Sequence, residues 1–243
     1  MATPPRETRI HASLLAGVEK RLLIWMAERL PPSINSDHLT GLGAIAMAAA
    51  GLAYAAAPYW PPALGLVVGL LAVNWFGDSL DGTLARVRHH ERPRYGFYVD
   101  HVLDAVGIFF LIAGLFAGGF VSALPASAFL LAYYLLTIEI ALATHALGVF
   151  RISYWKFGPT ELRIVLAIGT LQLLDSPWST IAGHRILLFD IGTWIGAAAL
   201  LITFLVSAIR NTKKLYALEP LPQPLPTLPT LPTLPKLQVS EHV

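Results

Sequence analysis

The stretch GDSLDGTLARVRHHERPRYGFYVDHVLDAVG, residues 77–107, lies between two long apolar runs. It holds four of the seven aspartates in the chain, Asp78, Asp81, Asp100 and Asp104. Ionised carboxylates are costly near hydrocarbon, so acids that gather beside apolar runs indicate a functional site. We therefore interpret the stretch as the junction of two membrane-spanning helices, with the aspartates near their shared end.

The composition extends this interpretation to the whole chain. Of the 243 residues, 55% are hydrophobic and only 13% are charged, and the mean hydropathy is +0.60. A soluble domain carries about 25% charged residues, so this chain has too little charge to cover a surface that faces water. The composition predicts an all-α, polytopic membrane protein. Because the chain has no cysteine, a disulfide framework and a thiolate metal site are excluded.

Six transmembrane helices are predicted from the apolar runs. A span needs about 20 apolar residues, with a range of ~17–25. The fifth run is the weakest, because Asp175, Ser176 and Pro177 cut it short. The predicted spans cover residues 38–57, 62–85, 97–117, 122–147, 160–176 and 186–208.

An N-terminal amphipathic helix is predicted over residues 8–30. Its apolar residues recur at helical spacing, and charged residues occupy the other faces. Such a helix can lie in the membrane interface, and a helix that faces water is the alternative. The apolar positions are Ile10, Leu14, Val18, Leu22, Trp25 and Met26.

The C-terminal segment repeats Leu-Pro-Thr. A proline at every third position favours an extended polyproline conformation, so we expect a disordered tail, with a docking segment for a partner as the alternative. The predicted parts of the chain are an interfacial helix with its linker, a six-helix transmembrane domain and this tail. They cover residues 1–36, 37–214 and 215–243.

The basic residues predict the orientation of the chain. Cytoplasmic loops of membrane proteins collect Lys and Arg. With the N-terminus inside and six spans, sixteen of the 17 Lys and Arg residues fall on the inner side, and only Arg185 falls outside. Both termini are therefore predicted to be cytoplasmic, and the aspartates lie at the cytoplasmic ends of the second and third spans. No cleavable signal peptide is apparent, because no apolar stretch precedes the first helix.

Helical spacing places the aspartates on two matching faces. At ~100° per residue, each of the two helices carries two aspartates and small residues within one face. The first face holds Asp78, Asp81, Gly82 and Ala85, and the second holds Gly96, Asp100, Asp104 and Gly107. Antiparallel helices joined by a basic loop can turn these faces toward each other. The sequence thus predicts four carboxylates around one cavity.

Four carboxylates this close cannot all remain ionised without partners. Oxygen ligands select hard cations such as Mg²⁺ or Mn²⁺. Two divalent cations would balance the four charges, and two-metal sites suit phosphoryl displacement. Arg86 could then pair with a phosphate through its two-pronged donors.

Two other interpretations of the aspartates stay open. Asp78 and Asp81 could be helix-end residues that pair with Arg86, Arg88 or Arg92. The acids could also relay cations or protons in a transporter. Their position at one end of two helices, rather than through the midplane, disfavours a relay. Glu139 is the only other acid at depth.

The same residues resemble the CDP-alcohol phosphatidyltransferase family. Its signature is D-x-x-D-G-x-x-A-R, a short gap, and then G-x-x-x-D-x-x-x-D. The chain matches every fixed position, with DSLDGTLAR at residues 78–86 and GFYVDHVLD at residues 96–104. The gap of nine residues is slightly longer than usual. The predicted spans and interfacial helix are also similar to those of the family.

The resemblance implies an enzyme of phospholipid biosynthesis in a bacterial inner membrane. Such an enzyme transfers a substituted phosphoryl group from a CDP-alcohol to an acceptor hydroxyl and releases CMP. The resemblance also implies a homodimer. It implies that Asp78, Asp81 and Asp100 hold two divalent ions, with Asp104 assisting and acting as the general base. The implied contacts to the CDP group come from Asp78, Gly82, Ala85 and Arg86.

The resemblance leaves two substrate pairs. CDP-diacylglycerol with a small polar acceptor is favoured. The alternative is CDP-choline or CDP-ethanolamine with diacylglycerol, because that branch is similar in having His101 after Asp100 and GPTE at residues 158–161. GPTE also fits a plain helix start. Lys156 and Arg163 are candidates for binding an anionic acceptor, and Glu161 is a candidate partner for a choline or ethanolamine cation.

Overall fold

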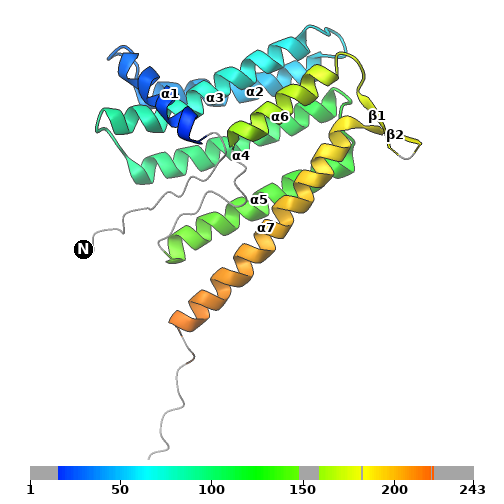
Figure 1. The fold of residues 1–243 in the computed structure, drawn as a ribbon. Helices are drawn as coiled ribbons and strands as arrows, with labels where there is room; N and C mark the ends of the chain where they lie inside the picture. The colour runs from blue at the N-terminus through cyan, green and yellow to red at the C-terminus, as the bar shows by residue number, and fades with distance from the viewer. Residues whose placement is uncertain (1–15, 148–158, 182, 220, 222–243) are drawn as a thin grey trace, which may run out of the picture.

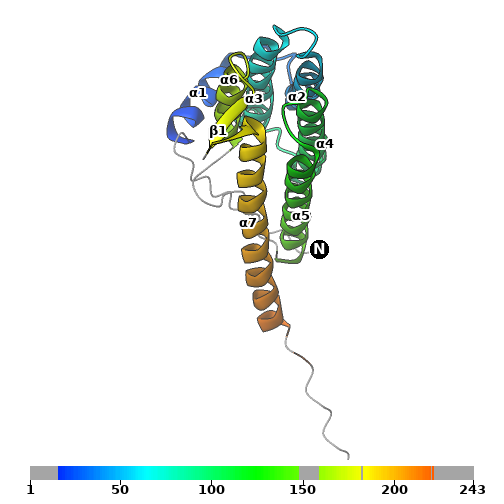
Figure 2. The same cartoon turned by 90° about the vertical axis from the view of Figure 1, so that its right-hand side faces the viewer.

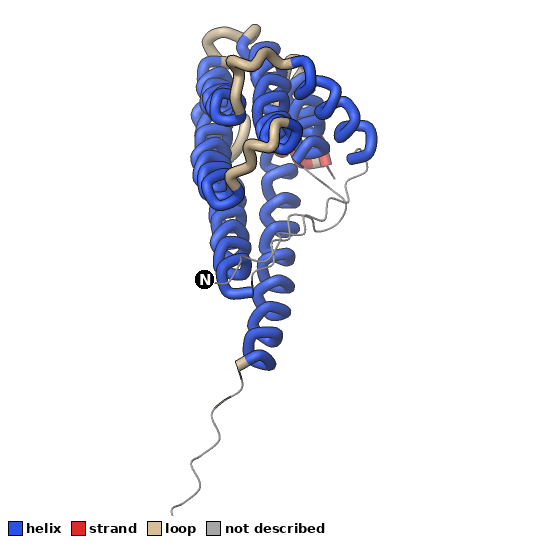
Figure 3. The backbone as a smooth tube through the Cα atoms, turned by 90° about the vertical axis from the view of Figure 1, so that its left-hand side faces the viewer, coloured by secondary structure: helices blue, strands red, loops and turns tan. Residues whose placement is uncertain are grey.

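The computed structural model of the protein describes residues 16–147, 159–181, 183–219 and 221. The described backbone is mostly helical, and short loops join many of the helices (Figure 3). Its helices are α1 (Ala16–Arg29), α2 (Ser36–Ala56), α3 (Ala63–Val87), α4 (Pro93–Ala117), α5 (Ala123–Leu147), α6 (Pro159–Gln172) and α7 (Leu188–Leu218). Between α6 and α7, β1 (Trp178–Ile181) and β2 (His184–Leu187) form an antiparallel hairpin (Figure 1).

Five of the described helices are long and apolar enough to cross a membrane, namely α2, α3, α4, α5 and α7. The chain is therefore a multi-pass membrane protein. Helix α6 corresponds to the predicted fifth span but has only 14 residues. At ~1.5 Å per residue it rises about 21 Å, which is less than the ~30 Å hydrocarbon core. The six-span count is therefore not confirmed.

Helix α6 ends at Gln172 rather than at the predicted residue 176, because the backbone forms a turn after Gln172. The carbonyl of Gln172 accepts the backbone N–H groups of Asp175 and Ser176 at 3.1 and 3.0 Å. Pro177, which cannot donate a backbone hydrogen bond, precedes the hairpin. The chain in this region is therefore a short helix followed by a hairpin, rather than one long helix.

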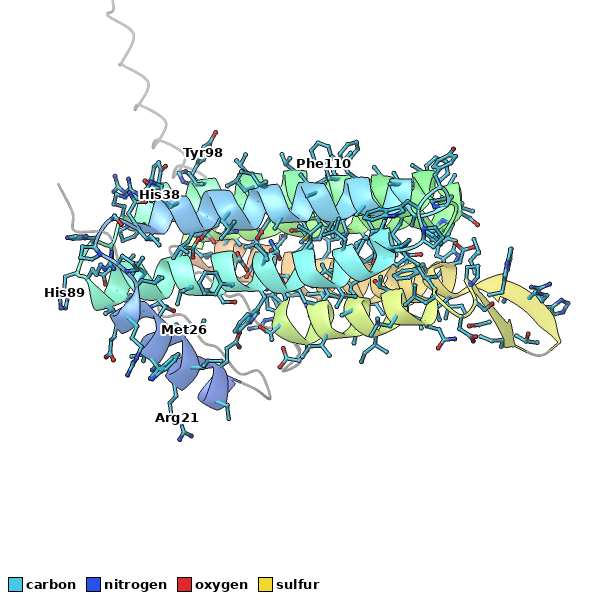
Figure 4. All side chains as sticks on the ribbon, turned by 90° about the horizontal axis from the view of Figure 1, so that it is seen from above. Arg21, Met26, His38, His89, Tyr98 and Phe110 are labelled. Atoms are coloured by element: carbon cyan, nitrogen blue, oxygen red, sulfur yellow. The ribbon has the colours of Figure 1, made fainter. Side chains whose placement is uncertain are left out.

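Helix α2 is the centre of the bundle, since it packs against both α3 and α4. The three helices run side by side, and α6 lies along α3 (Figure 4). Their apolar side chains form a core in which Tyr54, Val67, Leu111 and Leu115 are almost fully buried. The hydroxyl groups of Tyr54 and Thr170 lie 2.5 Å apart, which connects α2 to α6 within this core.

Two pairs of glycines allow these helices to touch through their backbones. A Cβ atom on Gly77 would lie 2.5 Å from the carbonyl oxygen of Leu39 and 2.7 Å from the nitrogen of Gly43, so α3 contacts α2 directly. A Cβ atom on Gly114 would overlap the carbonyl oxygen of Gly51, so the backbone of α4 also contacts the backbone of α2. Any side chain at these positions would push the helices apart.

Helices α5 and α7 form a second pair that diverges from the α2–α4 bundle (Figures 1 and 2). The Tyr134 hydroxyl on α5 donates to the carbonyl of Ala105 on α4 at 3.0 Å. The Asn211 amide on α7 donates to Glu139 Oε1 on α5 at 2.7 Å. Helix α7 ends at Leu218 rather than at the predicted residue 208. Most of the predicted tail lies outside the described residues.

Helix α1 lies obliquely at the end of the bundle where His38 and His89 lie (Figure 4). Leu23 and Ala27 bury against Leu80 and Leu84 of α3. Three residues of the predicted apolar face instead point outward, namely Val18, Leu22 and Trp25. Residues 8–15 of the predicted helix lie outside the described part. An exposed apolar face suits a membrane interface, and that location remains a prediction.

Candidate functional site

The four aspartates line one pocket between α2, α3 and α4. Asp78 and Asp81 come from α3, and Asp100 and Asp104 come from α4. The pocket is small and partly open to solvent. The remaining lining residues are Thr40, Gly43, Ala44, Met47, Asn74, Leu103 and Gly107. The aspartates of the two faces predicted from helical spacing therefore meet in this pocket.

Asp81 is the most enclosed of the four carboxylates, and its side chain is held on both oxygens. The residue is only 8% exposed. The Thr40 hydroxyl donates to Asp81 Oδ2 at 2.6 Å, and the backbone N–H of Gly82 donates to Oδ1. Asp104, by contrast, is exposed. One carboxylate is thus fixed in the wall, and another remains accessible.

Arg163 reaches the pocket wall from α6. Its Nη2 lies 2.5 Å from Asp78 Oδ2, and its Nε donates to Asn74 Oδ1 at 2.7 Å. Asn74 in turn donates to the carbonyl of Gly43 on α2 at 2.9 Å. The Arg163 side chain is 11% exposed, and its Nη1 is buried without a hydrogen-bond partner. This network joins α2, α3 and α6 at Asp78.

The donor atoms of the pocket fit hard cations, because four carboxylates offer only oxygen ligands. Their present arrangement is not a finished coordination site. Within the described ranges, no group of three or more acidic, histidine or cysteine side chains is placed to hold a metal ion. Thr40 and Arg163 already contact Asp81 and Asp78. The residue types thus suit a divalent ion, but side chains would have to shift.

The other predicted site residues lie around the pocket. Gly82, Ala85 and Arg86 follow on α3 but do not line it. Arg86 is exposed and donates to the Thr83 hydroxyl at 3.0 Å. Glu161 is buried in the first turn of α6. Lys156 lies outside the described residues.

Two of the arginines considered as plain ion-pair partners for Asp78 and Asp81 are engaged elsewhere. Arg88 donates to the carbonyls of Ile34, Leu30 and Pro31 at 2.5, 2.8 and 3.1 Å. Arg92 pairs with Asp37. Arg163, which is far away in the sequence, is the partner of Asp78 instead.

Sequence reasoning missed the contribution of α2 and of Asn74. Thr40 and Gly43 form part of the pocket, although α2 was predicted only as a span. Asn74 carried a signal, since it is a polar residue one helical turn before Asp78 inside an apolar run. Buried polar side chains need partners, so such a residue in a membrane helix marks a neighbouring polar group.

The chain is similar to a curated archaeal protein. It is 32% identical over 105 residues to the archaetidylinositol phosphate synthase of Methanothermobacter thermautotrophicus, a match that covers 42% of this chain and 49% of that protein. The chain thus spans about half the length of the curated relative it matches. No protein-family model matches the chain. The match supports the resemblance to CDP-alcohol phosphatidyltransferases loosely, as an enzyme family of membrane phospholipid synthesis.

Proposed function

We propose that the protein is a membrane enzyme of phospholipid synthesis that transfers a substituted phosphoryl group from a CDP-alcohol to an acceptor hydroxyl and releases CMP. The observation that carries this proposal is the pocket that gathers Asp78, Asp81, Asp100 and Asp104 from two helices. The similarity to a named phospholipid synthase supports the same reaction class. The catalytic part of the chain is then the helical domain of residues 37–214.

Asp78, Asp81 and Asp100, assisted by Asp104, are the residues that would hold two divalent cations, Mg²⁺ or Mn²⁺. When bound, such ions supply charge neutralisation for the diphosphate and for the departing CMP. The enclosed position of Asp81 suits a ligand that must stay fixed. Gly43 and Gly107 are part of the pocket wall, where they allow α2 and α4 to approach Asp78 and Met47 closely.

Asp104 is our candidate general base. It lines the pocket and is exposed, so an acceptor hydroxyl can reach its carboxylate. In the proposed step Asp104 takes the hydroxyl proton as the acceptor oxygen forms a bond to the phosphorus that carries the alcohol group. The bond from that phosphorus to the bridging oxygen breaks, and CMP leaves with the electron pair. A base must lie within hydrogen-bond reach of the proton that it abstracts.

The nucleotide part of the donor would bind along α3, where Gly82, Ala85 and Arg86 follow the aspartates. Two small residues on this segment allow a close approach to the helix. The exposed guanidinium of Arg86 can bind two phosphate oxygens at once. Asp78 would join these contacts from the pocket side.

An anionic acceptor is favoured by the position of Arg163. Its guanidinium contacts two residues of the pocket wall, Asn74 and Asp78, and its Nη1 is buried without a hydrogen-bond partner. The similar synthase is named for an inositol phosphate lipid, which agrees with an acceptor that carries a phosphate. CDP-diacylglycerol is the matching donor. In the alternative, with CDP-choline or CDP-ethanolamine and diacylglycerol, no anion needs binding there.

Radiolabelled CMP release from the purified protein tests the reaction class. The protein is incubated with CDP-diacylglycerol plus inositol phosphate or glycerol phosphate, and separately with CDP-choline plus diacylglycerol. Each mixture is assayed with and without Mg²⁺. We expect CMP release only with Mg²⁺ and only in the first pair. Release in neither pair would contradict the proposed reaction.

Arg163→Ala should raise the KM for an anionic acceptor by about 100-fold, because charge-assisted hydrogen bonds to a phosphate are strong. The KM for the CDP donor should change little. If the acceptor is diacylglycerol, Glu161→Gln should impair the reaction more than Arg163→Ala does. Steady-state kinetics with each substrate varied in turn measure both constants.

The matched control for Arg163→Ala is Arg185→Ala, which removes a cation on the β-hairpin. This control should leave both KM values unchanged. Unchanged kinetics in Arg163→Ala and Glu161→Gln would remove α6 from the acceptor site. In that case the role of Arg163 is limited to its contacts with Asp78 and Asn74.

The proposed topology has six passes, with both termini in the cytoplasm of a bacterial inner membrane, and the proposed assembly is a homodimer. Reporter fusions at His90 and after Lys214 should read as cytoplasmic, and a fusion at Ser179 in the hairpin should read as external. The expectation follows from the distribution of Lys and Arg. An external signal after Lys214 would overturn the charge argument.

A further inference from the structure

Arg163 occupies one of the two carboxylate oxygens that Asp78 could offer to a metal ion. Its Nη2 lies 2.5 Å from Asp78 Oδ2, and Asp78 is one of the carboxylates on the pocket. The pairing is enclosed rather than superficial, since the Arg163 side chain is only 11% exposed. The ion pair is therefore shielded on its Arg163 side, and it lies beside the pocket, whose lining includes Asp78 but not Arg163.

Simultaneous binding of a guanidinium and a divalent cation to the Asp78 carboxylate is electrostatically unfavourable. Both are positive, and like charges a few ångströms apart repel strongly where water is scarce. Within the described part of the chain the carboxylates also fail to form a three-ligand group. In this arrangement Asp78 is paired with Arg163, and the described carboxylates do not form a complete cation site.

Arg163 is nevertheless secured close to the pocket by contacts that do not depend on Asp78. Its Nε donates to Asn74 Oδ1 at 2.7 Å, and Asn74 is buried and bonded to the Gly43 carbonyl. If Nη2 leaves Asp78, this tether keeps the guanidinium beside the pocket. Nη1 already lacks an acceptor, and an unsatisfied buried donor is costly. Arg163 is thus suited to take up a second, anionic partner.

We propose that Arg163 and a divalent cation are alternative partners of Asp78. Cation entry displaces Nη2 from Asp78, and the tethered guanidinium is then available to the anionic group of the acceptor. The inference rests on the proposed function and adds a binding order to that function. The metal ion binds before the acceptor. Because linkage is reciprocal, an acceptor that holds Arg163 must also tighten metal binding. Asn74 acts as a positioning residue in this exchange.

The test measures Mn²⁺ affinity of the purified full chain in detergent by electron paramagnetic resonance, without substrate. Arg163→Gln removes the charge but keeps an amide that can still bond to Asn74. Loss of the competing partner should tighten Mn²⁺ binding about fivefold to tenfold. In an Asp78→Asn background the same substitution should have no effect, because the competition acts through Asp78. Arg163→Lys keeps a cation and should resemble the wild-type chain.

Arg92→Gln is the matched control. It removes the same charge from a pair with Asp37, which does not line the pocket, and should leave Mn²⁺ affinity unchanged. Circular dichroism and size-exclusion profiles check that each variant is folded. Equal or weaker Mn²⁺ binding by Arg163→Gln, with normal binding by the wild-type chain, would overturn the exchange alone. Absence of Mn²⁺ binding in both chains would also remove the metals from the proposed function.

Discussion

Asp81→Asn should lower CMP release by roughly 1,000-fold, which corresponds to about 4 kcal/mol in the activation free energy. A carboxamide is neutral and a poor ligand for a hard cation. The fold should survive, because the Thr40 hydroxyl that now donates to Asp81 Oδ2 can rotate and accept from the new amide. The Gly82 N–H would keep its acceptor on the remaining oxygen. The loss of activity would thus come from the site rather than from unfolding.

Asp37→Asn is the control for this substitution. Asp37 is at the start of α2 and pairs with Arg92 outside the pocket. The change should leave CMP release within about twofold, because exposed ion pairs contribute little. Treatment with EDTA should reproduce the Asp81→Asn defect in the wild-type chain, and Mg²⁺ or Mn²⁺ should restore activity. Full activity in EDTA would contradict the proposed role of the aspartates.

Gly114→Leu should prevent accumulation of a folded protein. A Cβ atom at residue 114 would overlap the carbonyl oxygen of Gly51, and a backbone obstacle cannot rotate away as a side chain can. Helices α2 and α4 would have to separate, and that separation would also open the pocket, because α2 and α4 both contribute to its walls. We expect a destabilisation of about 3 kcal/mol or more. The measurement is the yield of monodisperse protein in detergent and its thermal stability.

Gly69→Leu tests whether this effect is specific to the contact. Gly69 lies on α3, another spanning helix, but a Cβ atom there would meet nothing within 4 Å. Both substitutions add the same apolar side chain to a membrane helix and remove a glycine. The Gly69 variant should therefore fold as the wild-type chain does. Equal yields of the two variants would show that the α2–α4 contact tolerates expansion.

Helical spacing was sufficient to predict that the aspartates meet. Asp78 and Asp81 are three residues apart on one helix, and Asp100 and Asp104 are four apart on the next, so each pair shares a face. A short basic loop leaves the two helices little choice but to run antiparallel. This part of the site depends on local geometry, which the order of residues specifies.

The contacts that complete the pocket are not local and could not be read in the same way. Asp78 and Arg163 are 85 positions apart, and Thr40 and Asp81 are 41 apart. Their pairing depends on which face of α2 and α6 turns toward α3. Arg163 was singled out as a cation for an acceptor, but nothing in its own neighbourhood indicated Asp78 as its partner.

Hydrophobicity alone also left two elements undetermined. Residues 160–176 are apolar enough to suggest a span, but α6 ends at Gln172, where a turn takes over. In α1 the predicted apolar residues Val18, Leu22 and Trp25 are exposed. Leu23 and Ala27, which were not part of the predicted stripe, pack on α3. Periodicity identifies an apolar stripe, but it does not identify what covers the stripe.

The length of α7 has a practical consequence for handling the protein. Its 31 residues rise about 46 Å, which exceeds the ~30 Å hydrocarbon core. The surplus turns carry Lys213 and Lys214, which favour the water beyond the headgroups. Since a bilayer with its headgroups is ~40–45 Å thick, the helix is long enough to reach the membrane surface near Leu218. An affinity handle or a fiducial fused in frame with α7 for electron microscopy would therefore begin at the headgroups, and a longer helical fusion would be needed to hold it clear of lipid or detergent.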